Sequence, residues 1–233
     1  MLILAIETAT IEVGVAIGDE AGPLATVTAR PGRRQAETLH PAIEDVCRTA
    51  RVALAELDAI AVDIGPGLFT GLRVGVAAAK ALAAGLGLPV VTATSLEVLA
   101  AACPAGAGTV VPVVDMRRGE LAWLMPGGAG TAVRLGSPGE LAAELEALRS
   151  PVVLVGDGAL RHRAELAGSE SGEVVFAGVE LAAAPVASLV VLAIARMSKG
   201  NLCDPAEVRP LYGREADARI NWSSREARGA VGR

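Results

Sequence analysis

Residues 63–80 read Asp63-Ile-Gly-Pro-Gly-Leu-Phe-Thr-Gly-Leu-Arg-Val-Gly-Val-Ala-Ala-Ala-Lys80, and they connect an apolar segment to a long run of small residues. We expect residues 57–64 to form a strand, and residues 70–86 a helix with Thr70 as its N-cap. Along this helix small residues recur every four positions: Gly71, Gly75, Ala79, Ala83 and Gly87. Residues so spaced share one helix face, which admits another backbone at close range. That backbone belongs either to the chain's own sheet or to a second subunit.

The composition restricts the class of protein. The chain has 233 residues, 52% of them hydrophobic and 2% aromatic, so we expect a core built from Ala, Val and Leu. This length allows one large domain or two small ones. A net charge of −5 argues against a protein that binds nucleic acid alone through a basic surface.

The sequence carries no strong signal for export or for membrane insertion. Three cysteines are widely spaced, which fits reduced thiols: Cys47, Cys103 and Cys203. The apolar start reaches Glu7 early and lacks a basic region, so it predicts a strand rather than a signal peptide. Arg73 and Lys80 interrupt the apolar helix. We therefore expect a soluble, cytoplasmic protein with no membrane segment.

The order of predicted elements recurs along the chain. In the first half we expect strands at 2–7, 13–17, 24–30, 57–64 and 89–91, and helices at 35–51, 70–86 and 96–102, the last capped by Ser95. In the second half we expect strands at 109–115, 120–125, 131–135 and 152–156, and helices at 141–149 and 185–199. Ser137 and Glu140 form a capping box with Pro138 at the first helical position. An extra piece at 159–179 holds a short helix at 160–167 and a candidate strand.

Both halves thus run strand, strand, strand, helix, strand, helix. We predict an α/β chain with the duplicated actin-like fold, the ribonuclease-H-like (ASKHA) arrangement of two βββαβα halves. The predicted domains are residues 1–107 and residues 108–212, followed by a mobile tail at 213–233.

Few residues are suited to catalysis. Glu7 and Asp115 end the first strand of each half, and in a duplicated fold these ends face each other across a cleft. With Thr8 they are candidates for a residual nucleotide site, because carboxylates there can hold a divalent metal that bridges phosphates. The alternative is that each acid accepts backbone N–H groups of its turn. The glycine turns at 65–67 and 156–158 are weak phosphate-loop signals. The two histidines fall in different halves, so we expect no resident metal and no cofactor.

Three motifs together resemble the bacterial TsaB (YeaZ) family: Ile3-Leu-Ala-Ile-Glu-Thr-Ala-Thr10, Gly65-Pro-Gly-Leu-Phe-Thr-Gly-Leu-Arg-Val-Gly75 and Val114-Asp-Met-Arg-Arg-Gly-Glu120. The resemblance implies a role in forming N6-threonylcarbamoyladenosine in tRNA next to the anticodon. In that system TsaD is the catalytic subunit and holds the metal, TsaB is a non-catalytic dimerisation subunit, and the small ATPase TsaE joins them. The resemblance also implies that the chain meets tRNA only through the complex.

The resemblance further implies where a partner binds. The family uses the two helices of the first half, here 35–51 and 70–86, to contact TsaD or a second copy of the chain. The implied interface residues are Gln35, Leu39, Ile43, Phe69, Thr70, Gly71, Arg73, Val74, Gly75, Ala78 and Ala79. On this hypothesis Gly75→Arg abolishes TsaD binding and leaves the chain folded. Whether the chain alone is a homodimer stays open.

Two departures from the family pattern concern the cleft and the first helix. Glu7 stands where the family usually has Asp, and Gln35 stands where a His is common. Both weaken a nucleotide or metal site more than they weaken a scaffold role. The alternative function is an actin-like ATPase or phosphotransferase that uses Glu7 and Asp115, and it requires ATP binding that Asp115→Ala abolishes.

Overall fold

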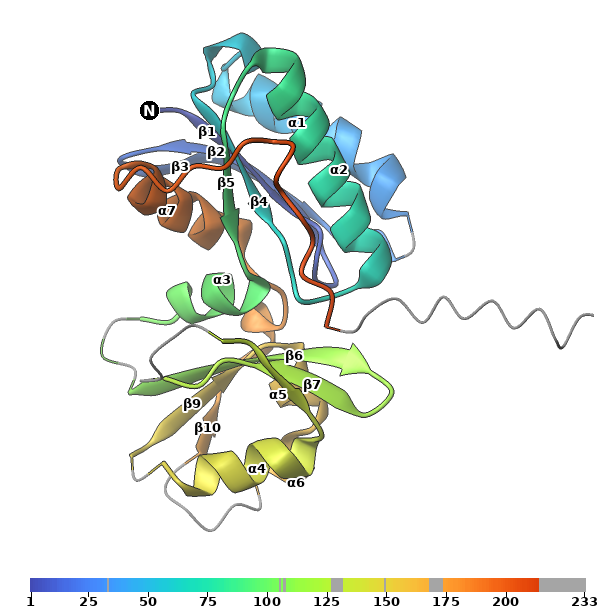
Figure 1. Cartoon of the computed structure of the whole chain (residues 1–233), viewed down its shortest axis with the longest axis vertical. Helices are drawn as coiled ribbons and strands as arrows, with labels where there is room; N and C mark the ends of the chain where they lie inside the picture. Colours follow the sequence, from blue (N-terminus) through green and yellow to red (C-terminus); the bar gives the residue numbers. More distant parts are fainter. Residues whose placement is uncertain are drawn as a thin grey trace, which may run out of the picture.

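The computed structural model describes residues 1–32, 34–104, 106, 108–126, 132–148, 150–167 and 174–213, and the structural statements below concern these residues. They form two five-stranded sheets, each accompanied by helices (Figure 1). The order of elements confirms the predicted duplicated actin-like fold with two βββαβα halves. Residue 131 and the predicted tail beyond Gly213 lie outside the described residues.

The first sheet has the strand order β3-β2-β1-β4-β5. Its strands are β1 (Ile3–Glu7), β2 (Val13–Asp19), β3 (Gly22–Ala29), β4 (Ala59–Asp63) and β5 (Val90–Ala93). Strand β2 runs antiparallel to β1 and β3, whereas β4 runs parallel to β1 and β5. Strands β1 and β4 are buried along their whole length, which explains why both are apolar without alternation.

The two faces of this sheet carry different helices. Helices α1 (Gln35–Ala50) and α2 (Phe69–Leu86) cover one face, together with the 3₁₀ turn Leu54–Glu56. Helices α3 (Ser95–Ala101) and α7 (Val186–Met197) cover the other. Successive strand residues therefore point to opposite cores: Ile6 contributes to the core under α1 and α2, and Ala5 to the core under α7.

The second sheet has the order β10-β9-β6-β7-β8. Its strands are β6 (Thr109–Arg117), β7 (Glu120–Trp123), β8 (Arg134–Gly136), β9 (Val152–Val155) and β10 (Val174–Phe176). The helices of this half are α4 (Pro138–Glu146), α5 (Asp157–Arg161) and α6 (Arg163–Leu166), followed by the 3₁₀ turn Val179–Leu181. Buried Trp123 packs with Leu141 and Leu145 of α4, so the largest side chain of this core lies between sheet and helix.

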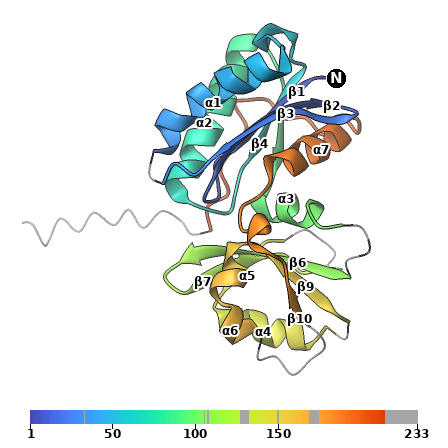
Figure 2. The ribbon, with the colours of Figure 1, turned by 180° about the vertical axis from the view of Figure 1, so that it is seen from behind.

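Helix α7 departs from the predicted division at residues 1–107 and 108–212. It follows the second half in sequence, yet Leu189, Val190 and Ala193 pack in the core that contains Ile3 and Ala5 of the first sheet. Figures 1 and 2 both show α7 against the first sheet. Residues after it continue on this half, where Cys203 forms a β-bridge to Val90. By packing, therefore, the end of the described chain lies with the first half.

Two helix caps differ from the predictions. Helix α2 begins at Phe69 with Leu68 as its N-cap, and Thr70 lies exposed within the first turn. Thr94, rather than Ser95, caps α3, because its hydroxyl accepts the Glu97 N–H at 3.2 Å while the Glu97 carboxylate accepts the Thr94 N–H at 2.8 Å. The capping box of Ser137 and Glu140 at α4 is confirmed.

By length and composition alone, α2 meets the criteria for a helix that crosses a membrane, and within its 18-residue window 33% of the residues are buried. Helix α2 also holds polar contacts to the rest of the chain. Lys80 donates to the carbonyl oxygens of Ala206 at 3.3 Å and Val208 at 3.1 Å. Helix α2 is thus packed on its own sheet on one side and bound by the C-terminal segment on another.

Candidate functional site

An apolar groove of about 550 Å³ runs between α1 and α2. Apolar side chains of both helices line it, among them Leu39, Ile43, Cys47, Val74, Ala78 and Leu82. The rim is polar, because His40 Nε2 lies 3.3 Å from Glu44 Oε1 on the exposed side of α1. An apolar floor with a polar rim is the composition of a protein-binding surface rather than of a catalytic pocket.

The groove arises from the spacing of residues on the two helices. On α1, Leu39, Ile43 and Cys47 recur every four positions, and on α2, Val74, Ala78 and Leu82 do the same. Because Ala78 is small, the two helices leave space above it that longer side chains would fill. Both helices lie side by side across the face of the first sheet, as Figures 1 and 2 show.

The predicted interface residues separate into three sets. Leu39, Ile43, Val74 and Ala78 line the groove, although Leu39 and Ile43 are themselves only 3% and 6% exposed, and Phe69, Thr70 and Arg73 are exposed at the start of α2. The third set is buried and forms no part of the groove lining, namely Gln35, Gly71, Gly75 and Ala79. For these four the expected place at an interface is corrected.

The face of α2 that carries the small residues Gly71 and Gly75 packs on the chain's own turn after β1. A Cβ atom added to Gly71 would overlap the carbonyl oxygen of Thr8, and one added to Gly75 would overlap the Thr8 hydroxyl. That hydroxyl donates to the carbonyl oxygen of Gly71 at 2.7 Å. The sheet, rather than a second subunit, therefore occupies this face. An arginine at position 75 has no room, so the expectation that Gly75→Arg leaves the chain folded is wrong.

Glu7 and Thr8, predicted for a residual nucleotide cleft, are bonded within the fold. Glu7 is fully buried, and its Oε1 accepts the backbone N–H of Thr10 at 2.8 Å and the Thr10 hydroxyl at 3.1 Å. This is the alternative in which the acid caps the turn after its strand. Burial, and then the charge of Asp63, raises the pKa of Glu7 well above its ordinary range.

Asp63 is the neighbour of Glu7 that the sequence reasoning missed. Strands β1 and β4 are parallel with Ile6 opposite Val62, so the next residues, Glu7 and Asp63, lie beside each other on one face. Asp63 Oδ1 accepts the Gly65 N–H at 2.7 Å and the Ser95 hydroxyl at 2.8 Å. Burial raises the pKa of Asp63 from 3.8 to about 7. A visible signal existed, since Glu7 ends the first predicted strand and Asp63 is the next-to-last residue of the strand predicted at 57–64.

The carboxylate of Asp115 is also bonded to residues of its own half. Its Oδ1 accepts the Arg117 backbone N–H at 2.8 Å, and its Oδ2 lies 2.8 Å from Arg117 Nη1 and 3.3 Å from Arg161 Nε. The Asp115 N–H donates to Asp157 Oδ1 at 2.9 Å, and burial raises the pKa of Asp157. The structure thus gives Glu7 and Asp115 separate internal partners instead of joining them in one site. No group of three or more His, Cys, Asp or Glu suited to a metal ion occurs among the described residues.

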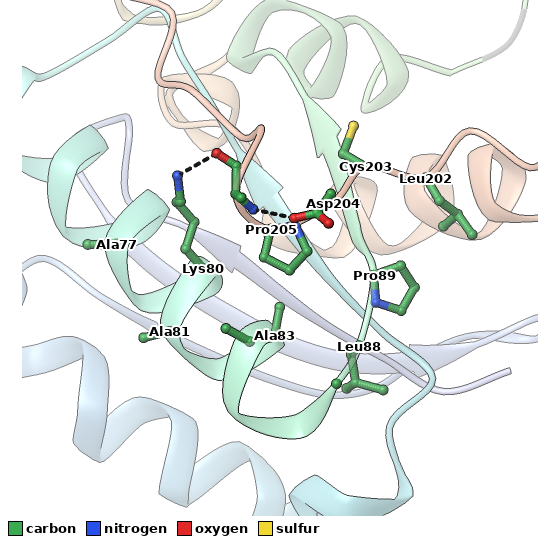
Figure 3. A pocket seen from close by; sticks show the side chains of 13 residues that line it. Ala77, Lys80, Ala81, Ala83, Leu88, Pro89, Leu202, Cys203, Asp204 and Pro205 are labelled. Carbon is green, nitrogen blue, oxygen red and sulfur yellow. Dashed lines mark hydrogen bonds between the residues drawn. The ribbon is translucent and has the colours of Figure 1, made fainter.

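A second groove, of about 1080 Å³, lies on another side of α2. Figure 3 shows it between Ala77, Lys80 and Ala83 of the helix and the segment from Leu202 to Pro205. Within this segment Asp204 Oδ1 accepts the Ala206 N–H at 2.7 Å. Part of this side of α2 is already occupied by the chain's own C-terminal segment, which distinguishes it from the groove between α1 and α2.

An aromatic and cationic cluster stands at the N-terminal end of α2. The Arg73 guanidinium carbon lies 3.7 Å from the centre of the Phe69 ring, and the Phe69 and Tyr212 ring centres are 5.3 Å apart. Arg73 Nε donates to the Tyr212 hydroxyl at 3.2 Å. Phe69 remains 45% exposed, although the chain has only two Phe and one Tyr. Exposed aromatic and arginine side chains of this kind are typical of binding surfaces.

Comparisons of the sequence found a matching family model and related proteins. A family model described as TsaD, tRNA N6-adenosine threonylcarbamoyltransferase, matches residues 27–131, a segment that contains α1 and α2. The Escherichia coli protein described as tRNA threonylcarbamoyladenosine biosynthesis protein TsaB is 36% identical over 75 residues, which are 32% of this chain and 32% of that protein. The aligned part spans between 22% and 32% of the length of the curated relatives that the chain matches.

Comparisons of the structure extend over nearly the whole chain. YeaZ from Pseudomonas aeruginosa superposes with a TM-score of 0.78 and 26% identity, covering 91% of this chain and 99% of that one. The activator of 2-hydroxyisocaproyl-CoA dehydratase from Clostridium difficile superposes with a TM-score of 0.50 and 12% identity, covering 91% of this chain and 99% of that one. The second likeness shows the fold alone, which is the actin-like arrangement.

Proposed function

We propose that this chain is a member of the TsaB (YeaZ) family and is the non-catalytic subunit that binds TsaD and supports N6-threonylcarbamoyladenosine formation in tRNA, next to the anticodon. The observation that carries this proposal is the apolar groove between α1 and α2, which no segment among the described residues fills. The bonds that hold Glu7 and Asp115 within their own halves support a role without catalysis.

The proposed occupant of the groove is the matching pair of helices in TsaD. The TsaD family model aligns with the segment that holds both groove helices, so a homologous partner presents a similar pair. Two such pairs can pack as four helices, with the apolar side chains of one filling the groove of the other. The exposed residues Phe69, Thr70 and Arg73 stand at the start of α2 and are not part of the groove lining.

The remaining partners follow from the same proposal. In the absence of TsaD a second copy of the chain can occupy the groove, which gives a homodimer through the same helices. TsaE joins the assembled pair, and tRNA is met by the complex in the cytoplasm. The net charge of −5 supports binding of tRNA by the complex rather than by this chain alone.

The substitution Ala78→Glu tests the groove. It places a carboxylate on the apolar floor, where desolvation without a partner opposes binding. We expect at least about a hundredfold weaker binding to TsaD in calorimetry, the equivalent of about 2.8 kcal/mol. Because Ala78 is partly exposed in the free chain, circular dichroism and the melting temperature should stay close to those of the original chain.

The matched control is Ala77→Glu, one position along the same helix. Ala77 is exposed and lines the other groove (Figure 3), so this variant adds the same charge on a different side of α2. We expect it to bind TsaD with unchanged affinity. Full binding by Ala78→Glu, or equal loss in both variants, would contradict the proposed surface.

A further inference from the structure

The hairpin between β6 and β7 carries a backbone conformation that its sequence does not favour. Arg117, Arg118 and Gly119 have φ angles of 67°, 57° and 79°, so three consecutive residues are left-handed. For a residue other than glycine this conformation is uncommon and costs about 1–2 kcal/mol, and such residues cluster at functional sites. The left-handed conformation of Arg117 and Arg118 therefore lowers the stability of the folded chain.

Ion pairs to Asp115 stabilise this turn and determine which of its charges remain exposed. Arg117 is paired to buried Asp115, and Arg161 reaches the same carboxylate at 3.3 Å. Asp157, whose Oδ1 accepts the Asp115 N–H at 2.9 Å, places a second carboxyl group beside these two guanidinium groups, so the positive charge that the turn presents is that of Arg118. Arg118 is exposed, and it makes no ion pair with the described part of the chain. The anchored arginines hold the turn, and Arg118 projects from it.

The hairpin lies next to the aromatic cluster at the start of α2. A Cβ atom on Gly213 would overlap Cε of Met116, so the residue after Tyr212 lies against the base of the hairpin. Figures 1 and 2 both show the hairpin, the start of α2 and the end of the described chain on one side of the molecule. We call Phe69, Arg73, Arg117, Arg118 and Tyr212 the basic–aromatic patch.

We propose that the basic–aromatic patch binds single-stranded RNA, and that in the complex this RNA is the anticodon loop of the tRNA substrate. The inference rests on the proposed function, which brings the chain to that tRNA. Guanidinium groups neutralise phosphates, and aromatic or guanidinium planes stack on unpaired bases. The patch offers both: Arg118 for a phosphate, and the exposed face of Phe69 beside Arg73 for a base.

Charge complementarity favours RNA as the occupant. The patch is basic on a chain whose net charge is −5. An acidic protein segment would also meet the guanidinium groups, but it would make no use of the stacked ring and guanidinium planes.

The test measures the complex of this chain with TsaD against a labelled anticodon stem-loop RNA by fluorescence anisotropy over a series of salt concentrations. Arg118→Ala should raise the dissociation constant about tenfold and reduce the slope of log K against log salt by about one, the value for one lost phosphate contact. The control is Arg163→Ala, because Arg163 also lies over an aromatic ring, 4.8 Å from the centre of Phe176, in α6. It should leave both quantities unchanged.

A second variant isolates stacking. With 2-aminopurine in the RNA loop, stacking on Phe69 quenches its fluorescence, and Phe69→Leu should abolish this change while keeping the side chain apolar. Unchanged affinity and salt slope in Arg118→Ala, or equal loss in Arg163→Ala, would overturn the proposal. Loss of TsaD binding by Arg118→Ala, with RNA binding intact, would overturn it in favour of a protein partner. Failure of the original chain to bind TsaD would instead refute the proposed function.

Discussion

At the scale of single residues, the pair Glu7 and Asp63 has the largest electrostatic consequence. Both side chains are fully buried, and in each carboxyl group one oxygen has hydrogen-bond donors while the other, Glu7 Oε2 or Asp63 Oδ2, has no donor among the described residues. Two ionised carboxylates side by side in a core are unfavourable, because burial penalises charge and like charges repel. Protonation relieves both penalties, and this is why the pKa of each group is raised.

This pair makes the stability of the chain depend on pH. The pKa of Asp63 is about 7 in the folded chain and 3.8 in its ordinary state, so the folded chain binds more protons between these values. Asp63 should therefore make the free energy of unfolding fall as pH rises from about 4 to 7, by up to about 1.4 kcal/mol per pH unit, and the raised pKa of Glu7 adds to this fall in the same direction. Urea unfolding at a series of pH values measures this slope.

The variant Asp63→Asn should reduce that slope by the contribution of Asp63, because an amide does not titrate, and leave the contribution of Glu7, whose pKa burial still raises. Exposed Asp45 on α1 provides the control, and Asp45→Asn should keep the slope of the original chain. An unchanged slope in Asp63→Asn would show that the dependence comes from other groups.

Sequence reasoning identified one member of this pair. A strand end followed by a polar turn allows either an open nucleotide cleft or an acid that caps its own turn. The structure has the capped turn, because Thr10 folds back on Glu7, and β4 brings Asp63 alongside. Parallel pairing of β1 with β4 joins residues 56 positions apart, and no local pattern contains that register.

At the scale of elements, α2 shows how one helix face is fixed by contact with backbone. Gly71 faces the Thr8 carbonyl oxygen, whereas a Cβ on Gly85 of the same helix would meet nothing within 4 Å. Identical substitutions should therefore have opposite effects. Gly85→Ala should stabilise the chain by about 0.5–1 kcal/mol through helix propensity. Gly71→Ala should destabilise it by about 3 kcal/mol or more, since overpacking against backbone cannot be relieved by a rotamer change.

Chemical denaturation of the two variants checks this pair of predictions. Equal effects would mean that helix propensity alone governs both glycines. Stabilisation by Gly71→Ala would show that the turn after β1 does not press on α2.

The existence of α2 was predictable from sequence, but the direction of its faces was not. A stripe of small residues fits a sheet as well as a partner, because both present backbone at close range. The groove between α1 and α2 depends on how the two helices lie on the sheet, and the four-residue spacing of Leu39, Ile43 and Cys47 indicates only that they share a face. The residues of α2 that pack on the sheet are covered, and only the residues on its other sides can contact a partner.

At the scale of the whole molecule, the return of α7 joins the two halves. One core contains Ala5 of the first sheet, Val114 of the second, Leu96 of α3 and Leu189 of α7. Arg196 of α7 adds an ion pair to Glu97 of α3 and donates to the Thr92 carbonyl oxygen. The repeated order of elements predicted two halves, but it assigned α7 to the half that precedes it, because sequence proximity carries no information on such a crossing.

Among the described residues, this architecture leaves the groove between α1 and α2 open, while α7 and α3 hold both halves together from the other side of the first sheet. An apolar groove on such a body suits a subunit that supports a catalytic partner. The claim that follows is that TsaD depends on this chain, and on this groove, to modify tRNA.

The most direct measurement is reconstitution of N6-threonylcarbamoyladenosine formation with purified TsaD, TsaE and tRNA, supplied with the threonylcarbamoyl adenylate donor. The account predicts modification when the original chain or Ala77→Glu is added, and at least about a hundredfold less with Ala78→Glu or without the chain. Full modification in the absence of the chain, or with Ala78→Glu at the same concentration, would contradict it.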